Sequence, residues 1–358
     1  MARIALIPGD GIGPEVLAEA EKVLRSVSET EDFPLEFDRW PHGADRYLET
    51  GYGMEEEEIH RLGTEYDGIL LGALGDPRVP GNEHARQILL GLRFQLDLFI
   101  NLRPVRLLDR RLTPLRDVRE EDLDLVIFRE NTEGVYVGMG GVFRRGTPQE
   151  MAIQEDVNTR FGIERIVRAA FEHARDHGVE RVTLSDKANA MEYAGGLWRR
   201  VFQEVGEEFP DIEREALYVD MLAMDLVRRP SRYRVIVTGN LFGDILSDLA
   251  AQLAGGLGLA ASANLHPGTA ALFEPVHGSA PDIAGSGNAN PLAAILTSAL
   301  LLRHLGRRGA ADRVEAAVQG AIRADETTGD LGGGLTTAQT GDAVVRRLAS
   351  AEDGRGWG

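Results

Sequence analysis

Two aspartates four residues apart carry the strongest chemical signal in this sequence. Asp244 and Asp248 lie in TGNLFGDILSDLAAQLAGG, where the apolar pattern predicts a helix over 242–254. Residues four apart project from one face of a helix, so both carboxylates can reach the same point. Like charges so placed destabilise a helix by roughly 0.2–0.5 kcal/mol unless a cation neutralises them. Oxygen ligands alone favour Mg²⁺ or Mn²⁺, and the alternative is a pair of solvated acids.

Lysine is almost absent from the sequence, which makes each lysine informative. Of the 39 basic residues only Lys22 and Lys187 are lysines. Lys22 lies on a predicted amphipathic helix, where a solvated ion-pairing role is expected. Lys187 follows an apolar run in TLSDKANAM. Because an ammonium can lose its proton where a guanidinium cannot, Lys187 is a candidate proton carrier, with chance retention as the alternative.

Three arginines lie at the ends of apolar runs. Arg93 and Arg103 flank the segment LFIN in GLRFQLDLFINLRPV, and Arg129 closes the run LDLVIF. A guanidinium binds a carboxylate in bidentate fashion, so three such positions would suit a di- or tricarboxylate. Taken singly, each arginine is more often structural, with its stem along apolar surface and its head in water.

Two glycine-rich segments could approach a nucleotide closely. GDGIGPE at 9–15 resembles a dinucleotide fingerprint, but Pro14 stands where the last glycine belongs, so the signal is weak. The loop 273–291, FEPVHGSAPDIAGSGNANP, is richer, because Asp282 can accept a hydrogen bond from a ribose hydroxyl. An acidic residue there disfavours a 2′-phosphate and so favours NAD over NADP. The alternative is an ornate surface loop.

The elements that must position these residues alternate between strands and helices. Continuous Val, Ile and Leu content predicts strands buried on both faces at 2–8, 67–73, 99–105, 123–129, 181–186 and 233–239. Helical periodicity predicts helices at 14–27, 159–177, 195–208, 242–254, 290–304 and 310–322. The alternation indicates an α/β fold, in which active sites gather at the carboxyl ends of strands. A period-2 stretch at 136–156 predicts a small antiparallel excursion.

Length and composition exclude several classes of protein. The chain has 358 residues, 43% of them hydrophobic and 27% charged, which suits two lobes or one large α/β unit. A net charge of −18 opposes binding to nucleic acid or anionic lipid. The absence of cysteine excludes disulfides, thiolate catalysis and Cys-ligated metals. The segment MARIALIPGDGIG is too short in its apolar part for a signal peptide or membrane span, so a cytoplasmic protein is expected.

Together these segments resemble the β-decarboxylating dehydrogenases, the family of isopropylmalate, isocitrate, homoisocitrate and tartrate dehydrogenases. The motifs NLRPV, RENTEG, DKANAM, YVDMLAMDLVRRP, VTGNLFGDILSDLA and FEPVHGSAPDIAG occur in the family's order, between IPGDGIGPE and DLGG at 330–333. The resemblance implies a two-domain fold with a mostly parallel central sheet flanked by helices, distinct from a Rossmann fold. It implies a cofactor-side domain of 1–102 and 253–358, and a substrate and dimerisation domain of 103–252.

The resemblance also assigns roles to residues at matching positions. The residues that would hold the substrate are Arg93, Arg103, Arg129 and Asn189. The divalent metal ligands would be Asp220, Asp244 and Asp248. The adenosine side of NAD would contact His277, Gly278, Ser279, Ala280, Asp282, Ile283 and Asn290. The catalytic groups would be Lys187, Tyr136 and Asp220, with Lys187 and Asp220 reaching across the interface of a homodimer with shared active sites. The arm at about 137–156 matches the family's dimerisation strands.

A mechanism follows from what the reaction needs. The substrate hydroxyl must lose a proton as hydride leaves C2 for NAD⁺, and Lys187, neutral or sharing a proton with Asp220, is the expected base. Mg²⁺ or Mn²⁺ would polarise the new ketone and stabilise the enolate left when carbon dioxide departs. Tyr136 would return a proton to carbon.

The substrate is inferred from the helix that precedes the first arginine. In HARQILLGLR, Leu89 and Leu90 would present an apolar wall suited to an isopropyl group, or would simply belong to the core. The expected reaction converts 3-isopropylmalate to 2-oxoisocaproate in leucine biosynthesis. Other features resemble relatives that act on tartrate, D-malate or homoisocitrate instead. They are Arg86, where typical isopropylmalate enzymes have glutamate, and the motifs RENTEG and GTPQEMAIQEDV. Rivals from other classes are a Mg²⁺-dependent phosphoryl-transfer enzyme, for which no phosphate loop is present, and a non-catalytic acidic binding protein.

Overall fold

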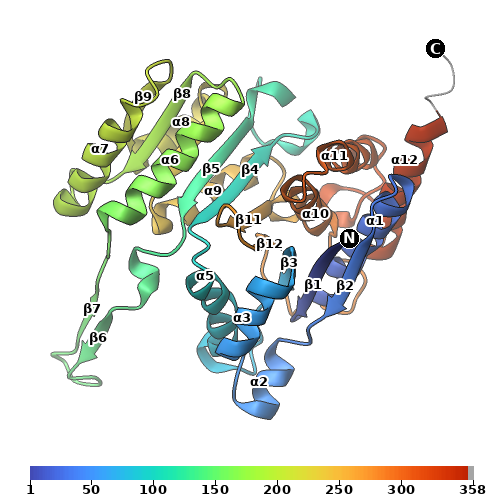
Figure 1. Ribbon diagram of the computed structural model, residues 1–358, viewed down its shortest axis with the longest axis horizontal. Helices are drawn as coiled ribbons and strands as arrows, with labels where there is room; N and C mark the ends of the chain where they lie inside the picture. The colour runs from blue at the N-terminus through green and yellow to red at the C-terminus, as the bar shows by residue number, and fades with distance from the viewer. Residues whose placement is uncertain (354–358) are drawn as a thin grey trace. The chain divides into compact units, whose positions relative to one another are not determined.

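The computed structural model describes residues 1–353, and the chain divides into two compact units (Figure 1). Unit 1 comprises Met1–Leu98, Leu107–Glu120 and the chain from Ala251 onward. Unit 2 comprises Phe99–Arg106 and Glu121–Ala250. The domain bounds expected from the sequence stay a prediction, and unit 1 differs from the expected cofactor-side domain by including residues 107–120 and 251–252 and by lacking residues 99–102.

The sheet of unit 1 is parallel except for one antiparallel pair of strands. Its order is β2-β1-β3-β12-β11, with β11 antiparallel to β12. The strands are β1 (Ala2–Gly9), β2 (Leu35–Arg39), β3 (Gly68–Ala73), β11 (Ala261–Leu265) and β12 (Ala271–Pro275). Every residue of β3, GILLGA, is buried, as its continuous apolar sequence predicts for a central strand.

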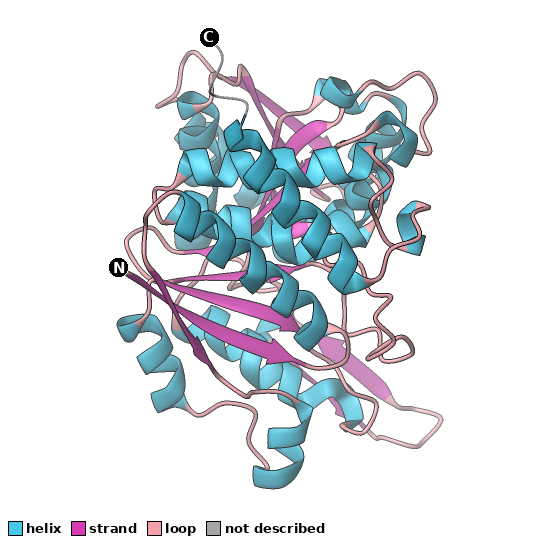
Figure 2. Cartoon of the chain, turned by 90° about the vertical axis from the view of Figure 1, so that its right-hand side faces the viewer, coloured by secondary structure: helices cyan, strands magenta, loops and turns pink. Residues whose placement is uncertain are grey.

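Four long helices of unit 1 pack on one another and appear grouped in Figure 1. They are α1 (Gly13–Thr30), α10 (Leu292–His304), α11 (Arg308–Arg323) and α12 (Thr337–Asp353). Helix α10, LAAILTSALLLRH, is apolar on nearly all sides and contacts α1, α11, β11 and β12, so it is the buried centre of this layer. The other helices are α2 (Ala44–Thr50), α3 (Glu56–Glu65), α4 (Glu83–Ala85) and α5 (Gly91–Gln95). Figure 2 shows the chain from the side, with helices in cyan and strands in magenta.

The sheet of unit 2 has the order β4-β5-β10-β8-β9, parallel except for the pair β4-β5. The strands are β4 (Ile100–Arg106), β5 (Asp124–Glu130), β8 (Arg181–Asp186), β9 (Glu213–Tyr218) and β10 (Val235–Thr238). The helices are α6 (Arg160–Asp176), α7 (Glu192–Gly206), α8 (Val219–Arg228) and α9 (Asn240–Leu253). The α/β class with a mostly parallel sheet, expected from the sequence, is confirmed.

A two-stranded antiparallel ribbon extends unit 2. It consists of β6 (Gly140–Phe143) and β7 (Met151–Gln154), and every residue of both strands is exposed. Its position agrees with the antiparallel excursion predicted over 136–156. Two exposed strands without a covering layer are marginally stable on their own, so this ribbon is a candidate for burial against another surface.

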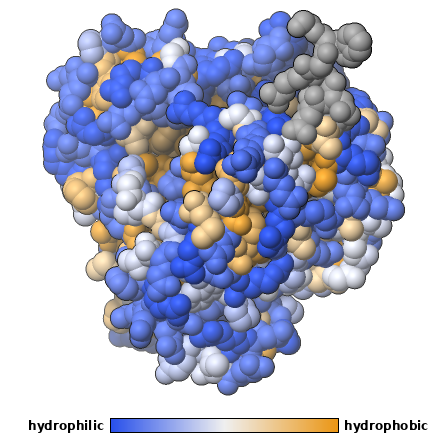
Figure 3. All heavy atoms as spheres, turned by 45° about the vertical axis from the view of Figure 1, so that its right-hand side comes forward, coloured by the Kyte–Doolittle hydropathy of each residue, from blue (hydrophilic) through white to orange (hydrophobic). Residues whose placement is uncertain are grey.

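The surface is polar, as the charged-residue content of 27% leads one to expect. The face seen in Figure 3 is mostly hydrophilic, with smaller hydrophobic patches between polar residues. Within residues 1–353, none of the helices combines the length and the apolar character needed to span a bilayer.

Helix α6 carries a half-buried histidine that predicts acid sensitivity. The ring of His173 stacks on His177 at 4.0 Å and meets Phe128 edge-on at 5.1 Å. Burial, aided by the charge of His177, lowers the pKa of His173 to about 4. Between pH 6.5 and 4 the unfolded chain therefore binds a proton that the folded chain does not. The resulting stability is present above about pH 6.5 and is lost as the pH falls through the folded pKa.

We expect His173 to account for a loss of about 1–2 kcal/mol of unfolding free energy between pH 7 and pH 4, allowing for its partial exposure. Urea denaturation of the wild type and His173→Gln across this range measures it. As the pH falls toward 4, the unfolding free energy of the wild type should decrease relative to that of His173→Gln. A difference that is constant with pH would contradict this assignment.

Candidate active site

The two aspartates lie on consecutive turns of α9, which begins directly after β10. The side chains of Asp244 and Asp248 are 36% and 51% exposed, so both carboxylates face solvent from the carboxyl end of the sheet. Burial raises the pKa of Asp248, Arg103 opposes that rise, and the charge of Asp244 adds to it. The predicted pairing of the two acids on one helical face is therefore observed.

Arg129 reaches this acid pair from the end of β5, and its side chain is almost fully buried. Its Nε donates to the backbone oxygen of Asn240 at 2.9 Å, and its Nη2 donates to Asn240 Oδ1 at 2.7 Å. Its Nη1 donates to Asp244 Oδ1 at 2.5 Å. A side chain at Gly243 would place Cβ 2.5 Å from Arg129 Cγ, so a glycine is required where the arginine passes α9.

Arg103 on β4 approaches the same two carboxylates. Its Nη1 donates to Ser247 Oγ at 2.6 Å, and its Nε donates to Asn101 Oδ1 at 2.7 Å. Its guanidinium lies 3.3 Å from Asp244 Oδ1 and 3.4 Å from Asp248 Oδ1. Two buried guanidinium groups thus face two carboxylates, an arrangement that can bind an anion and a cation side by side.

Tyr136 completes this group. Its hydroxyl donates to Asp244 Oδ2 at 3.1 Å, and the guanidinium of Arg129 lies 5.3 Å from its ring centroid. Burial raises the pKa of Tyr136, and the charge of Asp244 raises it further. The phenol therefore keeps its proton near neutral pH and is a donor, as the proposed proton return requires.

Lys187 and Asp220 form a separate pair. Lys187 follows β8, Asp220 lies in the first turn of α8, and the lysine Nζ donates to Asp220 Oδ1 at 2.5 Å. The hydrogen bond from Lys187 lowers the pKa of Asp220, whose side chain is 62% exposed. Asn189 is exposed in the turn just after Lys187. Among residues 1–353 no three acidic or histidine side chains form a metal-binding group, so one copy does not bring Asp220 to the acid pair on α9.

A small cavity connects the segment of Lys187 with the start of α9. It has a volume of about 50 Å³, and its lining includes Lys187, Ser185, Trp198 and Asn240. The Ser185 hydroxyl is buried and has no hydrogen-bond partner in the described part of the chain. A cavity of this size holds water rather than a substrate.

The predicted cofactor residues lie in unit 1, in the loop that follows β12. The His277 ring bonds the Gly278 oxygen through Nδ1 at 3.0 Å, and its Nε2 is buried without a partner. Asp282 is exposed and makes no hydrogen bond or ion pair with residues 1–353, and Ile283 is 37% exposed. The carboxylate of Asp282 is therefore open to a ligand, whereas His277 Nε2 is a buried polar atom.

Other residues of this loop are held within the chain. The Ser279 backbone oxygen accepts a hydrogen bond from Ile12 N at 2.8 Å, and the next residue, Ala280, has φ of +39°. A Cβ at Gly11 would lie 2.0 Å from that Ser279 oxygen. Close packing against this loop therefore explains why position 11 in GDGIGPE is a glycine. Both ends of the Asn290 amide are used, by Asp330 at 2.9 Å and by Leu292 N at 2.9 Å.

Arg93 and its preceding segment also lie in unit 1. Arg93 is buried in α5, where its Nη2 donates to Glu274 Oε1 at 2.8 Å and its Nε has no partner. Residues Arg86–Leu90 form a π-helical turn, a feature frequent at functional sites. Leu89 packs against the core of unit 1, while Leu90 is partly buried outside that cluster. Leu90 is therefore the better candidate for contact with a ligand.

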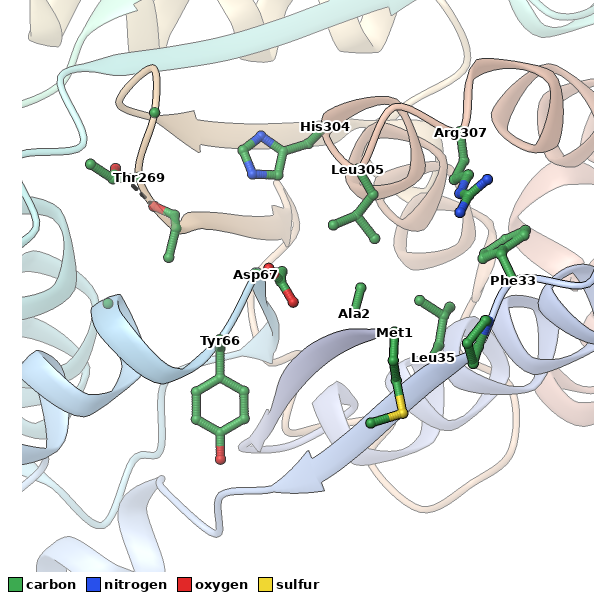
Figure 4. Close-up of a pocket in the computed structure, with 14 residues that line it drawn as sticks. Met1, Ala2, Phe33, Leu35, Tyr66, Asp67, Thr269, His304, Leu305 and Arg307 are labelled. Carbon is green, nitrogen blue, oxygen red and sulfur yellow. Dashed lines mark hydrogen bonds between the residues drawn. The ribbon is translucent and has the colours of Figure 1, made fainter.

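A cavity of about 550 Å³ lies elsewhere in unit 1, at the amino ends of the strands (Figure 4). Ala2, Leu35 and Asp67 contribute to its lining, and the guanidinium of Arg307 lies 4.9 Å from the Phe33 ring centroid. None of the predicted site residues lines it. It is distinct from the carboxyl ends of the strands, where the predicted chemistry lies.

Comparison with known proteins decides the family. The profile described as isocitrate/isopropylmalate dehydrogenase matches residues 3–344. The chain belongs to this dehydrogenase family. Proteins named 3-isopropylmalate dehydrogenase from Thermobifida fusca and Streptomyces griseus are each 48% identical, over 97% of this chain and 98% of each relative.

Solved structures agree with the assignment to the isocitrate/isopropylmalate dehydrogenase family. Isocitrate dehydrogenase from Methylococcus capsulatus superposes with a TM-score of 0.88 at 39% identity, covering 97% of this chain and 99% of that one. A beta-decarboxylating dehydrogenase from Thermococcus kodakarensis gives 0.80 at 38% identity, covering 100% and 99%. The resemblance noted from the sequence is confirmed, and the phosphoryl-transfer alternative finds no support.

Sequence reasoning missed the residues that hold the two arginines of unit 2. Asn240 holds Arg129, because its Oδ1 accepts from the guanidinium. Asn101 and Ser247 hold Arg103. The contact between Asn101 and Arg103 could have been predicted from their positions, because residues two apart on a strand lie on the same face.

Proposed function

We propose that this dehydrogenase catalyses the NAD-dependent oxidative decarboxylation of 3-isopropylmalate to 2-oxoisocaproate, a step of leucine biosynthesis. The observation that carries the chemistry is the acid pair Asp244 and Asp248 facing the buried guanidinium groups of Arg103 and Arg129. The names of the 48% identical relatives support the substrate. The cytoplasmic location expected from the sequence stays a prediction.

The acid pair fits a divalent cation. Its donors are carboxylate oxygens only, which suits Mg²⁺ or Mn²⁺, and the raised pKa of Asp248 reflects burial and like charge that a cation would relieve. We propose Asp244 and Asp248 as ligands from one copy and Asp220 as the ligand from a second copy. The metal, when bound, polarises the C2 oxygen of the substrate and stabilises the enolate.

The side chains of this chain divide the remaining work. Arg103 and Arg129 bind the substrate carboxylates, and Arg93 would bind them from unit 1. The Lys187 Nζ accepts the proton of the C2 hydroxyl, with Asp220 holding the ammonium in place. The Tyr136 hydroxyl, kept protonated by burial, donates a proton to the carbon that has lost carbon dioxide.

The loop after β12 supports NAD as the cofactor. The unpartnered Nε2 of His277 offers a buried hydrogen-bonding atom, which fits a nucleotide edge. The free carboxylate of Asp282 fits the two hydroxyls of a ribose and repels a 2′-phosphate. NAD, when bound, supplies the hydride acceptor. The role of Asn290 in this proposal is to shape the loop, since its amide is already engaged.

We propose a homodimer in which each active site uses both copies. Exposed apolar side chains gather on the two helices that carry the aspartates. They are Met221, Met224 and Val227 on α8, and Leu241 and Ile245 on α9. The exposed ribbon β6-β7 adds Val142, Phe143, Met151 and Ile153. Apolar surface of this extent marks a protein interface, and a second copy would cover it while bringing Lys187 and Asp220 to the other acid pair.

Steady-state NADH formation with Mn²⁺ tests the proposed function. The assay compares 3-isopropylmalate with D-malate, tartrate, homoisocitrate and isocitrate, and NAD⁺ with NADP⁺. We expect kcat/KM for 3-isopropylmalate to exceed that of every other acid by about a hundredfold or more. Burial of the three carbons of its isopropyl group contributes that much discrimination. A hundredfold preference for another acid would overturn the substrate, and the absence of NADH with every acid would overturn the reaction.

A further inference from the structure

A buried histidine outside the predicted site joins four segments of unit 1. His84 in α4 is fully buried, and its Nε2 lies 2.7 Å from Asp10 Oδ2. Asp10 follows β1, and its carboxylate also accepts from Ala44 N at 2.6 Å and Gly75 N at 2.8 Å. One carboxylate therefore ties together the ends of β1 and β3, the start of α2 and the helix α4.

The pair lies where it can influence a ligand site. Asp10 and Gly75 follow the carboxyl ends of parallel strands, the edge at which α/β proteins bind ligands. The loop of Asp10 also holds the candidate cofactor loop, through the bond from Ile12 N to Ser279 O. Charge-assisted hydrogen bonds in a buried setting are strong and geometrically demanding, so the position of His84 is tightly fixed.

Few polar contacts fix the start of the segment that contains His84. Helix α4 has no side-chain cap, and the residues before it, Gly81 and Asn82, both adopt left-handed φ values of +67° and +52°. The π-helical turn Arg86–Leu90 follows at once. Gln87, whose Oε1 accepts from Gly53 N at 2.8 Å, is its other polar anchor, and Ile88 lies fully buried in the core of unit 1. The apolar core holds this turn by Ile88, and the polar contacts of His84 and Gln87 set how the turn is oriented on that core.

Arg93, at the far end of the same segment, has an independent anchor. Its guanidinium is held by Glu274, which Asn264 Nδ2 also contacts at 3.0 Å. Loss of the Asp10–His84 bond would thus disturb Arg86–Leu90 more than Arg93. The Asp10–His84 contact would therefore affect the binding of a substrate's substituent, and the Glu274–Arg93 contact would affect the binding of its carboxylate.

We propose that Asp10 and His84 are positioning residues for substrate selectivity. The pair holds the π-helical turn Arg86–Leu90 in the orientation that presents Leu90 to the 3-substituent of a malate, whereas Glu274 holds Arg93 for the carboxylate shared by all malates. This inference rests on the proposed function and extends it to residues that do not touch substrate.

Kinetics of His84→Leu and His84→Gln test the inference. We expect His84→Leu to lower kcat/KM for 3-isopropylmalate about tenfold through KM, with D-malate changed less than about twofold, because a displaced apolar contact affects only the substituted acid. His84→Gln retains a neutral N–H donor for Asp10 and should restore selectivity to within about twofold of wild type. Adding Asp10→Asn to His84→Leu should cost little further selectivity, since the bond is already gone.

A matched control separates positioning from stability. Tyr66→Phe removes another buried polar contact of unit 1, the hydroxyl shared by Trp40 Nε1 and Asp38 Oδ2, and should lower the thermal midpoint without changing selectivity. Equal losses on both malates in His84→Leu, or a selectivity change in Tyr66→Phe, would overturn the inference. The wild-type substrate panel tests the proposed function separately, and the variants are compared on the preferred acid of that panel.

Discussion

Lys187→Met is expected to lower kcat by about a thousandfold, the scale on which a positioned acid or base contributes to proton transfer. Lys187 is bonded to Asp220 at 2.5 Å, and no other lysine occurs in unit 2. Lys187→Arg should be nearly as inactive, because arginine can keep the ion pair with Asp220 but cannot give up its proton. Steady-state NADH formation measures both variants.

The second lysine of the chain provides the matched control. Lys22 pairs with Glu19 at 2.5 Å and with Asp342 at 2.7 Å, both in unit 1. Lys22→Met should therefore keep wild-type kcat and KM. Activity of Lys187→Met within threefold of the wild type would remove Lys187 from the mechanism.

Asp244→Asn is expected to weaken Mn²⁺ binding about a hundredfold and to lower kcat at saturating Mn²⁺ by a similar factor, because one anionic ligand is lost. The asparagine oxygen can still accept from Arg129, so the fold around α9 should persist. Electron paramagnetic resonance of free Mn²⁺ gives the affinity without reference to activity. Thermal unfolding of the variant checks the fold.

Asp176→Asn is the control for this substitution. Asp176 ends α6 and pairs with Arg175 at 3.0 Å in an exposed position, so its replacement changes the net charge by the same amount. It should leave Mn²⁺ affinity unchanged. Equal Mn²⁺ affinities for Asp244→Asn and the wild type would exclude Asp244 as a ligand.

The sequence predicted the elements with continuous apolar runs or strong helical periodicity. The predicted strand at 181–186 coincides with β8, and the helix predicted at 159–177 differs from α6 by one residue at each end. Strands β2, LEFDR, and β9, EREALY, were missed because both are edge strands with charged residues and no long apolar run. Tertiary pairing, rather than local composition, makes them strands.

The candidate site was predictable in its chemistry and less so in its contacts. The four-residue spacing of Asp244 and Asp248 determines that they share a face of α9. Nothing in the spacing indicates that Asn240 and Ser247 would hold the arginines, because those contacts join segments more than 100 residues apart. The Asp10–His84 bond, between residues 74 apart, is likewise a product of topology.

We propose that each active site takes Asp244 and Asp248 from one copy and Lys187 and Asp220 from the other. The direct test mixes inactive Lys187→Met with inactive Asp244→Asn chains, by unfolding and refolding them together in equal amounts. Half of the dimers are then mixed, and each mixed dimer has one site with every native group, so about a quarter of wild-type NADH formation should return. If the mixture remains as inactive as its parents while mixed dimers form, each site draws these groups from a single chain, and an active site shared between two copies is excluded.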